Sequence, residues 1–254
     1  MKITDPSFNY DQHGQAYSGQ RNTDPRIAEF VNKALGDART VINIGAGAGS
    51  YEPEDRYVIA VEPSIVMRSQ RMDKHKIPAV IGSAGNLPFD NQAFDAAMAM
   101  ITVHHWPDIK QGLQELRRVT RKQIVIMTFD PDALDDCWNA AYFPEVIDVE
   151  KQRYPTIDFL TDTLGGNCEV QSVPVPLDCV DGFQEAYYGR PEAFLSSAVR
   201  KGQSAWGFIP EDEQERIVKR LADELQSGKW DEKYGHFRTQ PAFTGALRLI
   251  IANP

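Results

Sequence analysis

The sequence predicts an α/β fold in which a mainly parallel sheet is covered by helices on both faces. Two observations predict it. Apolar stretches of strand length alternate along the chain with amphipathic stretches of helix length, and the first apolar stretch, residues 41–44, runs directly into a glycine-rich turn. A chain of 254 residues, 42% of them hydrophobic, is long enough for one such domain with a full core and additional helices.

The turn after the first strand is the most informative feature of the chain, because Gly45, Gly47 and Gly49 alternate with alanines in it. Residues without a Cβ let the backbone fold tightly and approach a bound molecule closely, and a loop that opens toward a helix offers unpaired N–H groups. The spacing typical of dinucleotide binding would require glycine at position 50, where the chain has Ser50. We therefore expect a ligand on this turn whose nature the turn alone does not specify.

Helix signals surround the predicted strands. Asp24 and Pro25, an apolar stripe and then Gly36 predict a capped helix before the first strand. A second amphipathic helix is expected over residues 107–118, with Arg117 and Arg118 at its end, where the helix dipole favours cations.

Further strands follow the glycine turn. Residues 57–61 form a buried strand that ends in Glu62, and a third element covers residues 79–89. A fourth strand is expected over residues 94–101 and a fifth over residues 123–129. Ligands collect at the carboxyl edge of such sheets, so the residues after each strand are the candidates for a site.

The second half of the chain is expected to add helices around the ligand end of the sheet. Helical patterns cover residues 132–149, 191–201 and 210–227. Strands are expected at residues 169–174 and, as an edge hairpin, at residues 245–251.

Charge and composition exclude several function classes. The formal net charge of -9 and the pI near 5.1 disfavour a nucleic-acid partner, which needs dense basic patches. No apolar stretch is long enough to span a bilayer and the start has no apolar signal region, so we expect a cytoplasmic protein without a membrane partner. Cys137, Cys168 and Cys179 lack the spacing of a zinc site, and no metal is expected. The oligomeric state stays open.

The order and spacing of these motifs resemble class I S-adenosylmethionine-dependent methyltransferases over residues 15–130, particularly the small-molecule branch related to the ubiquinone/menaquinone and natural-product methyltransferases. The resemblance implies a Rossmann-like sheet with an antiparallel last strand and one domain over residues 1–254. Within it, residues 1–36 would form an N-terminal lid and helix and residues 37–130 the cofactor-binding half. Residues 131–254 would supply substrate-cap helices and the last strands.

The same resemblance implies S-adenosylmethionine as methyl donor and S-adenosylhomocysteine as product. Glu62 would accept hydrogen bonds from the ribose hydroxyls, Ser83 and Ala84 would lie at the adenine edge, and Arg21 in the lid would face the methionine carboxylate. The expected donor-binding residues are Tyr17, Arg21, Asn43, Gly45, Ala46, Gly47, Gly49, Glu62, Pro63, Ser64, Ser83, Ala84 and Ile101.

The chain departs from the family pattern at three places. Asn43 stands where an acidic residue commonly balances the methionine ammonium, and Ser83 replaces a usual aspartate near the adenine. Only residues 50–56 separate the last glycine from the second strand, so the usual first helix is cut to about a turn.

Candidate proton-transfer groups follow the fourth and fifth strands. His104 or His105 would act as a base, oriented by Asp130, in an arrangement similar to that of sugar and polyketide O-methyltransferases with this fold. The alternative is that this sequence only caps the next helix, and methylation of an amine or an activated carbon needs no base. O- or N-methylation is favoured over C-methylation.

The substrate is expected to be a small, aromatic or heterocyclic metabolite enclosed by aromatic side chains of the second half. The candidates are Trp106, Trp138, Tyr142, Asp181, Tyr187, Tyr188, Arg190 and Trp206. The alternative for the rings is that they pack the added helices onto the domain. The stretch around residues 178–191 is alternatively a solvated turn and helix cap.

Two other function classes remain open at this stage. An NAD(P)-dependent oxidoreductase would share the glycine turn and an acidic second strand, but the chain contains no Tyr-x-x-x-Lys sequence. A non-catalytic protein that keeps the methyltransferase fold for binding or as a scaffold is compatible with Asn43 and Ser83. Binding of S-adenosylmethionine without turnover would identify such a scaffold.

Overall fold

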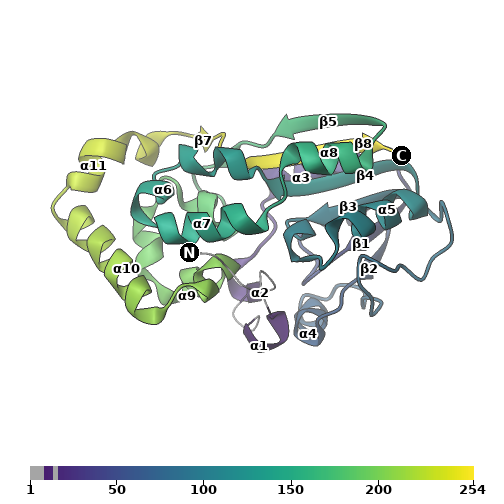
Figure 1. The fold of residues 1–254 in the computed structure, drawn as a ribbon, viewed down its shortest axis with the longest axis horizontal. Helices are drawn as coiled ribbons and strands as arrows, with labels where there is room; N and C mark the ends of the chain where they lie inside the picture. Colours follow the sequence, from purple (N-terminus) through teal and green to yellow (C-terminus); the bar gives the residue numbers. More distant parts are fainter. Residues whose placement is uncertain (1–8, 14–16) are drawn as a thin grey trace.

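The computed structural model describes residues 9–13 and 17–254 and has a six-stranded sheet at its centre (Figure 1). The strands are β1 (Thr40–Ile44), β2 (Tyr57–Val61), β3 (Phe94–Met100), β4 (Thr120–Phe129), β5 (Asn167–Ser172) and β8 (Leu247–Asn253). Their spatial order is β2-β1-β3-β4-β8-β5. The first four strands in this order are parallel, whereas β8 runs antiparallel to both β4 and β5. The mainly parallel sheet with an antiparallel last strand is therefore confirmed.

Helices cover both faces of the sheet and form a lobe beside it (Figure 1). They are α1 (Tyr10–His13), α2 (Tyr17–Gln20), α3 (Pro25–Leu35), α4 (Ile65–Asp73), α5 (Ile109–Val119), α6 (Asn139–Tyr142), α7 (Pro144–Arg153), α8 (Ile157–Leu164), α9 (Ser197–Lys201), α10 (Glu211–Gln226) and α11 (Lys229–Tyr234). Helix α3 packs against β4 and β8 on one face, while α5 and α8 pack together on the other.

The side chains of each strand point alternately to the two faces of the sheet, and this alternation gives each face its own core. In β1, Val41 belongs to the core on the α3 side, whereas Ile42 belongs to the core on the α5 side. Neighbours in β3 divide in the same way, because Met98 faces the α3 side and Ala99 the α5 side. Successive side chains of a strand point to opposite faces, so a strand buried on both faces is an almost continuous apolar run.

Local capping fixes the two helices that the sequence predicts around the strands. The carboxylate of Asp24 accepts the Arg26 N–H at the start of α3, next to Pro25. Asp108 accepts the Gln111 N–H at the start of α5. Both predictions are confirmed, but helix α4, which Ser64 caps through the Met67 N–H, was not predicted.

The predicted third element and last strand differ from the structure. Residues 79–89 contribute one isolated parallel bridge, Val61 to Val80, and no strand. Ile81 is 72% exposed, so this segment lies at an uncovered edge where it gains little from burial. Strand β8 lies inside the sheet, and β5 forms the edge instead.

The lobe is formed by the parts of residues 131–243 that lie outside α8 and β5, and it also contains a small two-stranded sheet, β6 (Val175–Pro176) with β7 (Ala242–Phe243). The single helix expected over residues 132–149 is split into a 3₁₀ turn, α6 and α7, because Pro144 cannot continue a helix and instead starts the next one. Helix α10 matches its prediction closely. Helices α8 and α11 were not predicted. Among the described residues, no helix combines the length and apolarity needed to cross a membrane.

Gly112 permits the close approach of α5 to a ring that belongs to the site described below. A Cβ at position 112 would lie 2.5 Å from Cε3 of Trp106 and 3.1 Å from the Ala84 Cβ. We expect Gly112→Ala to lower the free energy of unfolding by about 1–3 kcal/mol, because overpacking outweighs the gain in helix propensity. Urea denaturation would measure the change. In the matched control Gly235→Ala, the added Cβ would meet Asp231 at an ordinary 3.6 Å. The account fails if both substitutions have the same effect.

Candidate active site

Two cavities meet at the carboxyl edge of the sheet. The outer cavity is formed by segments that follow β1, β2 and β3, together with residues 82–84. The inner cavity lies between the end of the sheet and the lobe. Four residues line both cavities: Tyr10, Arg21, Ile101 and His105. The two cavities are therefore neighbours, and these four residues form the boundary between them.

The glycine turn forms the floor of the outer cavity. Gly45 has φ +65°, and a Cβ there would lie 2.1 Å from Oγ1 of Thr102, so no other residue fits without moving the loop after β3. The N–H groups of Gly45 and Ala46 both donate to the Val61 carbonyl, at 2.9 and 3.1 Å. These bonds tie the turn to the end of β2. The backbone next to Gly47 is thus presented to the cavity, as the sequence predicts.

Glu62 is held in this cavity by backbone N–H groups. One carboxylate oxygen accepts the Gly47 N–H at 2.8 Å and the other accepts the Ser64 N–H at 2.9 Å. Burial raises the pKa of Glu62 above its ordinary value, although the two N–H donors oppose this shift. Each carboxylate oxygen can accept more than one hydrogen bond. Glu62 is therefore oriented by the protein and can still accept hydrogen bonds from a ligand.

Asn43 is oriented by a buried ion pair that the sequence reasoning missed. Its Nδ2 donates to Oε1 of Glu52 at 2.9 Å, and Arg71 binds both oxygens of Glu52 at 2.7 and 2.8 Å. The side chains of Glu52 and Arg71 are 4% and 1% exposed. Because Nδ2 is held in this way, Oδ1 of Asn43 is the atom left to accept a bond, and it is buried without a partner. A ligand donor would satisfy it.

Most of the predicted donor-binding residues line this outer cavity. They are Arg21, Asn43, Gly45, Ala46, Gly47, Glu62, Pro63, Ser64, Ser83, Ala84 and Ile101. Gly49 does not line the outer cavity. It faces Arg71 behind the turn, since an added Cβ would lie 2.8 Å from Nη1 of that arginine. The side chain of Tyr17 lies outside the described residues.

Ile101 lies at the junction of the cavities in a strained conformation. Its φ is +50°, which is unfavourable for a β-branched residue. The Ile101 N–H donates to the Met127 carbonyl at 2.7 Å, and this bond holds the residue against the neighbouring strand. Such strain persists only where the surroundings fix it, and it concentrates at functional sites. The conformation turns the chain from β3 toward the histidines.

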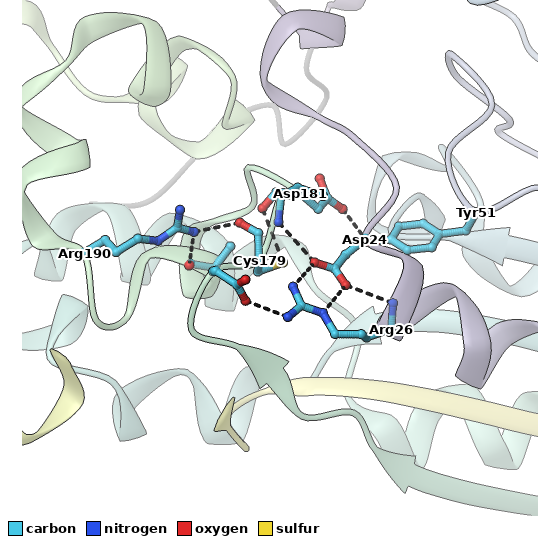
Figure 2. A network of polar contacts seen from close by, with 9 residues as sticks. Asp24, Arg26, Tyr51, Cys179, Asp181 and Arg190 are labelled. Carbon is cyan, nitrogen blue, oxygen red and sulfur yellow. Dashed lines mark hydrogen bonds and ion pairs between the residues drawn. The ribbon is translucent and has the colours of Figure 1, made fainter. Parts of the chain in front are cut away.

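Arg21 joins the N-terminal segment to the lobe. Its Nε donates to Oδ1 of Asp181 at 2.6 Å, and the Tyr51 hydroxyl donates to Oδ2 at 2.7 Å. In Figure 2 the carboxylate of Asp181 lies close to both Tyr51 and Asp24. Asp181 is fully paired with Arg21 and Tyr51 and lines neither cavity, so its predicted contact with substrate is wrong.

His105 is held by two partners. Nη2 of Arg153 lies 3.1 Å from Nδ1, and the Tyr10 hydroxyl lies 2.8 Å from Nε2. A guanidinium only donates, so Nδ1 accepts and the ring proton lies on Nε2. Neighbouring His104 stacks on His105 with ring centroids 3.8 Å apart, and its Nδ1 is buried without a partner. Burial, reinforced by the positive charge of Arg153, lowers the pKa of both histidines well below the ordinary value.

Asp130 does not orient either histidine, which corrects the sequence prediction. Its Oδ1 accepts the Asp132 N–H at 3.2 Å, and its Oδ2 pairs with Nη2 of Arg248, also at 3.2 Å. Asp130 therefore caps the turn that follows β4 and ties it to β8. It is absent from the lining of both cavities.

The inner cavity has apolar walls and an unexpectedly polar lining. Its walls include Phe129, Phe183, Leu134 and Ile147. The polar residues in its lining include Gln184 and Glu185, from the stretch 178–191 that was considered for substrate specificity. Those that the sequence reasoning missed are Asn139, Glu150, Gln203 and Ser204. Burial raises the pKa of Glu150, and it raises the pKa of Glu185 to about 7.

Six predicted substrate residues do not line either cavity and belong to the packing of the lobe instead: Trp138, Tyr142, Tyr187, Tyr188, Arg190 and Trp206. Nε1 of Trp138 donates to the Tyr188 carbonyl, and the Tyr142 hydroxyl donates to Glu224. Arg190 donates to two backbone carbonyls, as Figure 2 shows. In the structure these side chains pack the added helices, as the alternative interpretation expects. Trp106, by contrast, lines the outer cavity.

No group of three or more His, Cys, Asp or Glu side chains that could hold a metal ion occurs in the described part of the chain. The cysteines are unpaired, and burial raises the pKa of Cys137 and Cys179, the latter to about 12. They therefore remain protonated thiols at neutral pH.

Comparison with known proteins places this geometry in context. Residues 42–127 match the family model described as a methyltransferase domain. The uncharacterized protein MJ1252 of Methanocaldococcus jannaschii is 26% identical over 161 residues, a match that covers 60% of this chain and 64% of that protein. The match thus spans less than two thirds of this relative's length.

Solved structures share the fold over nearly the whole chain. One protein of Anabaena variabilis, described as a candidate methyltransferase of an antibiotic biosynthesis pathway, has a TM-score of 0.83 and 28% identity, covering 94% of this chain and 99% of that one. An S-adenosylmethionine-dependent methyltransferase of Thermotoga maritima, with histamine N-methylation as its suggested activity, has a TM-score of 0.57 and 14% identity, covering 96% and 97%. The second likeness shows the fold alone. Together with the family match, the glycine turn and the position of Glu62, these similarities confirm the resemblance found in the sequence: residues 42–127 match a methyltransferase domain, and the chain has the Rossmann-like fold of class I S-adenosylmethionine-dependent methyltransferases.

Proposed function

We propose that this methyltransferase acts on a small molecule held in the inner cavity, with the methyl donor in the outer one. The single observation that carries the proposal is that the two cavities are neighbours, since Ile101 and His105 line both of them. S-adenosylmethionine supplies a methyl group that its sulfonium charge already activates. The protein's task is then alignment, since holding two reactants in line contributes about 7–11 kcal/mol.

The outer cavity suits the donor at each polar position. Glu62 is assigned to the ribose hydroxyls, and the backbone hydrogen bonds that fix its orientation support this assignment. The unpartnered Oδ1 of Asn43 is assigned to the methionine ammonium, with the negative charge of Glu52 directly behind it. Ser83 and Ala84 are assigned to the adenine edge, which they reach from the loop after the Val61–Val80 bridge. The negative charge that Asn43 lacks is thus supplied by Glu52, its hydrogen-bond partner.

Arg21 is assigned to the methionine carboxylate, although Asp181 already binds two of its nitrogens. The ion pair stabilises the position of the guanidinium at the boundary of both cavities.

We propose O- or N-methylation, because the inner cavity contains groups that can accept a proton. His105 is a poor candidate, since Arg153 occupies its basic nitrogen. His104 and Glu150 each have a buried polar atom without a hydrogen-bond partner in this cavity. The raised pKa of Glu150 makes its carboxylate a stronger base than an exposed one.

The acceptor we propose is a free metabolite and not a nucleic acid. The inner cavity has the lining typical of a small-molecule site, with apolar and aromatic walls and a few buried polar groups. The net charge of -9 provides no general attraction for a polyanion.

Replacement of Glu62 tests the donor site. We expect Glu62→Ala to weaken binding of S-adenosylmethionine by about 2 kcal/mol or more, roughly a 30-fold rise in Kd, because a charged acceptor is lost. Isothermal titration calorimetry measures this directly. In the matched control Glu54→Ala, an acidic side chain that is 89% exposed is removed from the same region, and the affinity should not change.

Glu62 also holds two backbone N–H groups, so the thermal midpoint of each variant must accompany its affinity. Unchanged affinity in a folded Glu62→Ala variant would refute the assignment. Tight binding by the wild type without turnover on any acceptor would instead favour the non-catalytic alternative.

The buried state of His104 predicts a pH dependence of stability. Its folded pKa lies well below the unfolded value near 6.5, because burial disfavours the imidazolium. The unfolded chain therefore takes up a proton that the folded protein does not. The contribution of neutral His104 to the free energy of unfolding is therefore complete above pH 6.5. It is lost as the pH falls toward the folded pKa.

We expect the stability difference between the wild type and His104→Gln to shrink by up to about 2 kcal/mol between pH 7.5 and pH 5.0. Urea denaturation at both pH values measures it. Glu185, whose pKa burial raises to about 7, titrates with the opposite sign, but both proteins share it and its effect cancels. A difference that does not vary with pH would show that His104 is not buried in its neutral form.

A further inference from the structure

Three carboxamide side chains line the inner cavity without any hydrogen-bond partner. Asn139 begins α6, Gln184 begins a 3₁₀ turn, and Gln203 precedes another. For each, both the amide nitrogen and the amide oxygen are buried and unpartnered. Asn139 is 1% exposed and Gln203 is 6% exposed, so open solvent does not satisfy them. All three line the same cavity although they come from separate parts of the lobe.

Such groups are costly unless something completes their hydrogen bonds. A buried donor or acceptor left unsatisfied costs about 1–3 kcal/mol, so three intact carboxamides in one cavity indicate a ligand that pairs with them. A carboxamide offers a donor and an acceptor side by side. The matching ligand also has neighbouring donors and acceptors, as in a lactam or a ring hydroxyl next to a ring nitrogen.

The charges around the cavity are balanced. Arg21 is paired with Asp181, and Arg153 lies 3.8 Å from a carboxylate oxygen of Glu150. Glu185 accepts the Ala246 N–H with both oxygens. The lining thus contains the guanidinium group of Arg21 and the carboxyl groups of Glu150 and Glu185. Each of them already has a charged or hydrogen-bonding partner, so none offers an unpaired charge to an ion.

The walls favour a flat molecule. The rings of Phe129 and Phe183 lie 5.5 Å apart between centroids, and Phe129 makes an edge contact at the same distance with Tyr154. All three rings line the cavity. Aromatic faces next to polar edges are complementary to a planar ring with hydrogen-bonding substituents.

We propose that the methyl acceptor is an uncharged, planar heterocycle with lactam or ring-hydroxyl groups, recognised by the side chains of Asn139, Gln184 and Gln203. This inference rests on the proposed function, because it assigns the inner cavity to the acceptor. In this proposal the three carboxamides determine the specificity for the acceptor. The buried tryptophans and tyrosines of the lobe, which the sequence predicts for this role, do not.

Binding measurements on the full-length chain test the inference without turnover. The probes are 4-hydroxy-2-quinolone, which has a lactam and a ring hydroxyl, and 1-naphthol, a fused ring of similar size with only a hydroxyl. Titration calorimetry with and without S-adenosylhomocysteine gives both affinities. We expect the quinolone to bind wild-type protein about tenfold tighter or more.

Two matched substitutions separate recognition from structure. Gln203→Met removes an unpartnered carboxamide, so it should abolish the preference for the quinolone while the thermal midpoint stays equal or rises. Gln214, by contrast, donates to the carbonyls of Trp206 and Ile209 at 3.0 Å. Gln214→Met should therefore lower the thermal midpoint and preserve the preference.

The outcomes are distinguishable. Absence of quinolone binding up to millimolar concentration, equal affinity for the two probes, or an unchanged preference in Gln203→Met would each overturn the inference. Binding of S-adenosylhomocysteine in the same samples reports separately on the donor site. If the wild type fails to bind it, the proposed function is wrong, whatever the two probes show.

Discussion

The buried carboxylate of Glu62 is the interaction on which the site depends. It joins the glycine turn to the end of β2 by accepting the N–H groups of Gly47 and Ser64. A carboxylate withdrawn from water is costly unless hydrogen bonds compensate it, so the two N–H groups and the carboxylate must stay together. The turn can approach this closely only because Gly45 leaves room for Thr102. The strand ends are thereby fixed around one acidic group before any ligand binds.

The two halves of the protein contribute different chemistry and are joined by arginines. The sheet half presents backbone groups and the carboxylate of Glu62 to the outer cavity, whereas the lobe presents carboxamides to the inner one. Arg21 reaches from the N-terminal segment to Asp181 in the lobe. Arg153 on α7 reaches back to His105 after β3. These charged hydrogen bonds fix the positions of the two cavities relative to each other. The boundary between the cavities is therefore also the place where the two halves of the protein meet.

Much of the sheet half could be predicted from sequence because its signals are local. Alternating burial, caps such as Asp24 and the glycine turn depend on neighbours within a few residues. The pairing of Glu52 with Arg71 links an unpatterned loop to a helix that was not predicted, so no local signal indicated it. Aromatic content in the lobe was interpreted as a pocket, but large rings such as Trp138 fill the core, where burial of their area stabilises most. The polar lining, including Gln203, comes from turns whose packing only the tertiary structure determines.

A structure of the protein in complex with S-adenosylhomocysteine tests the central claim most directly. The account predicts the nucleoside in the outer cavity, with its ribose hydroxyls on Glu62 and its amino group against Oδ1 of Asn43. The inner cavity would then open beside the sulfur, past Ile101. A ligand bound elsewhere, or a ribose that does not contact Glu62, would contradict the account.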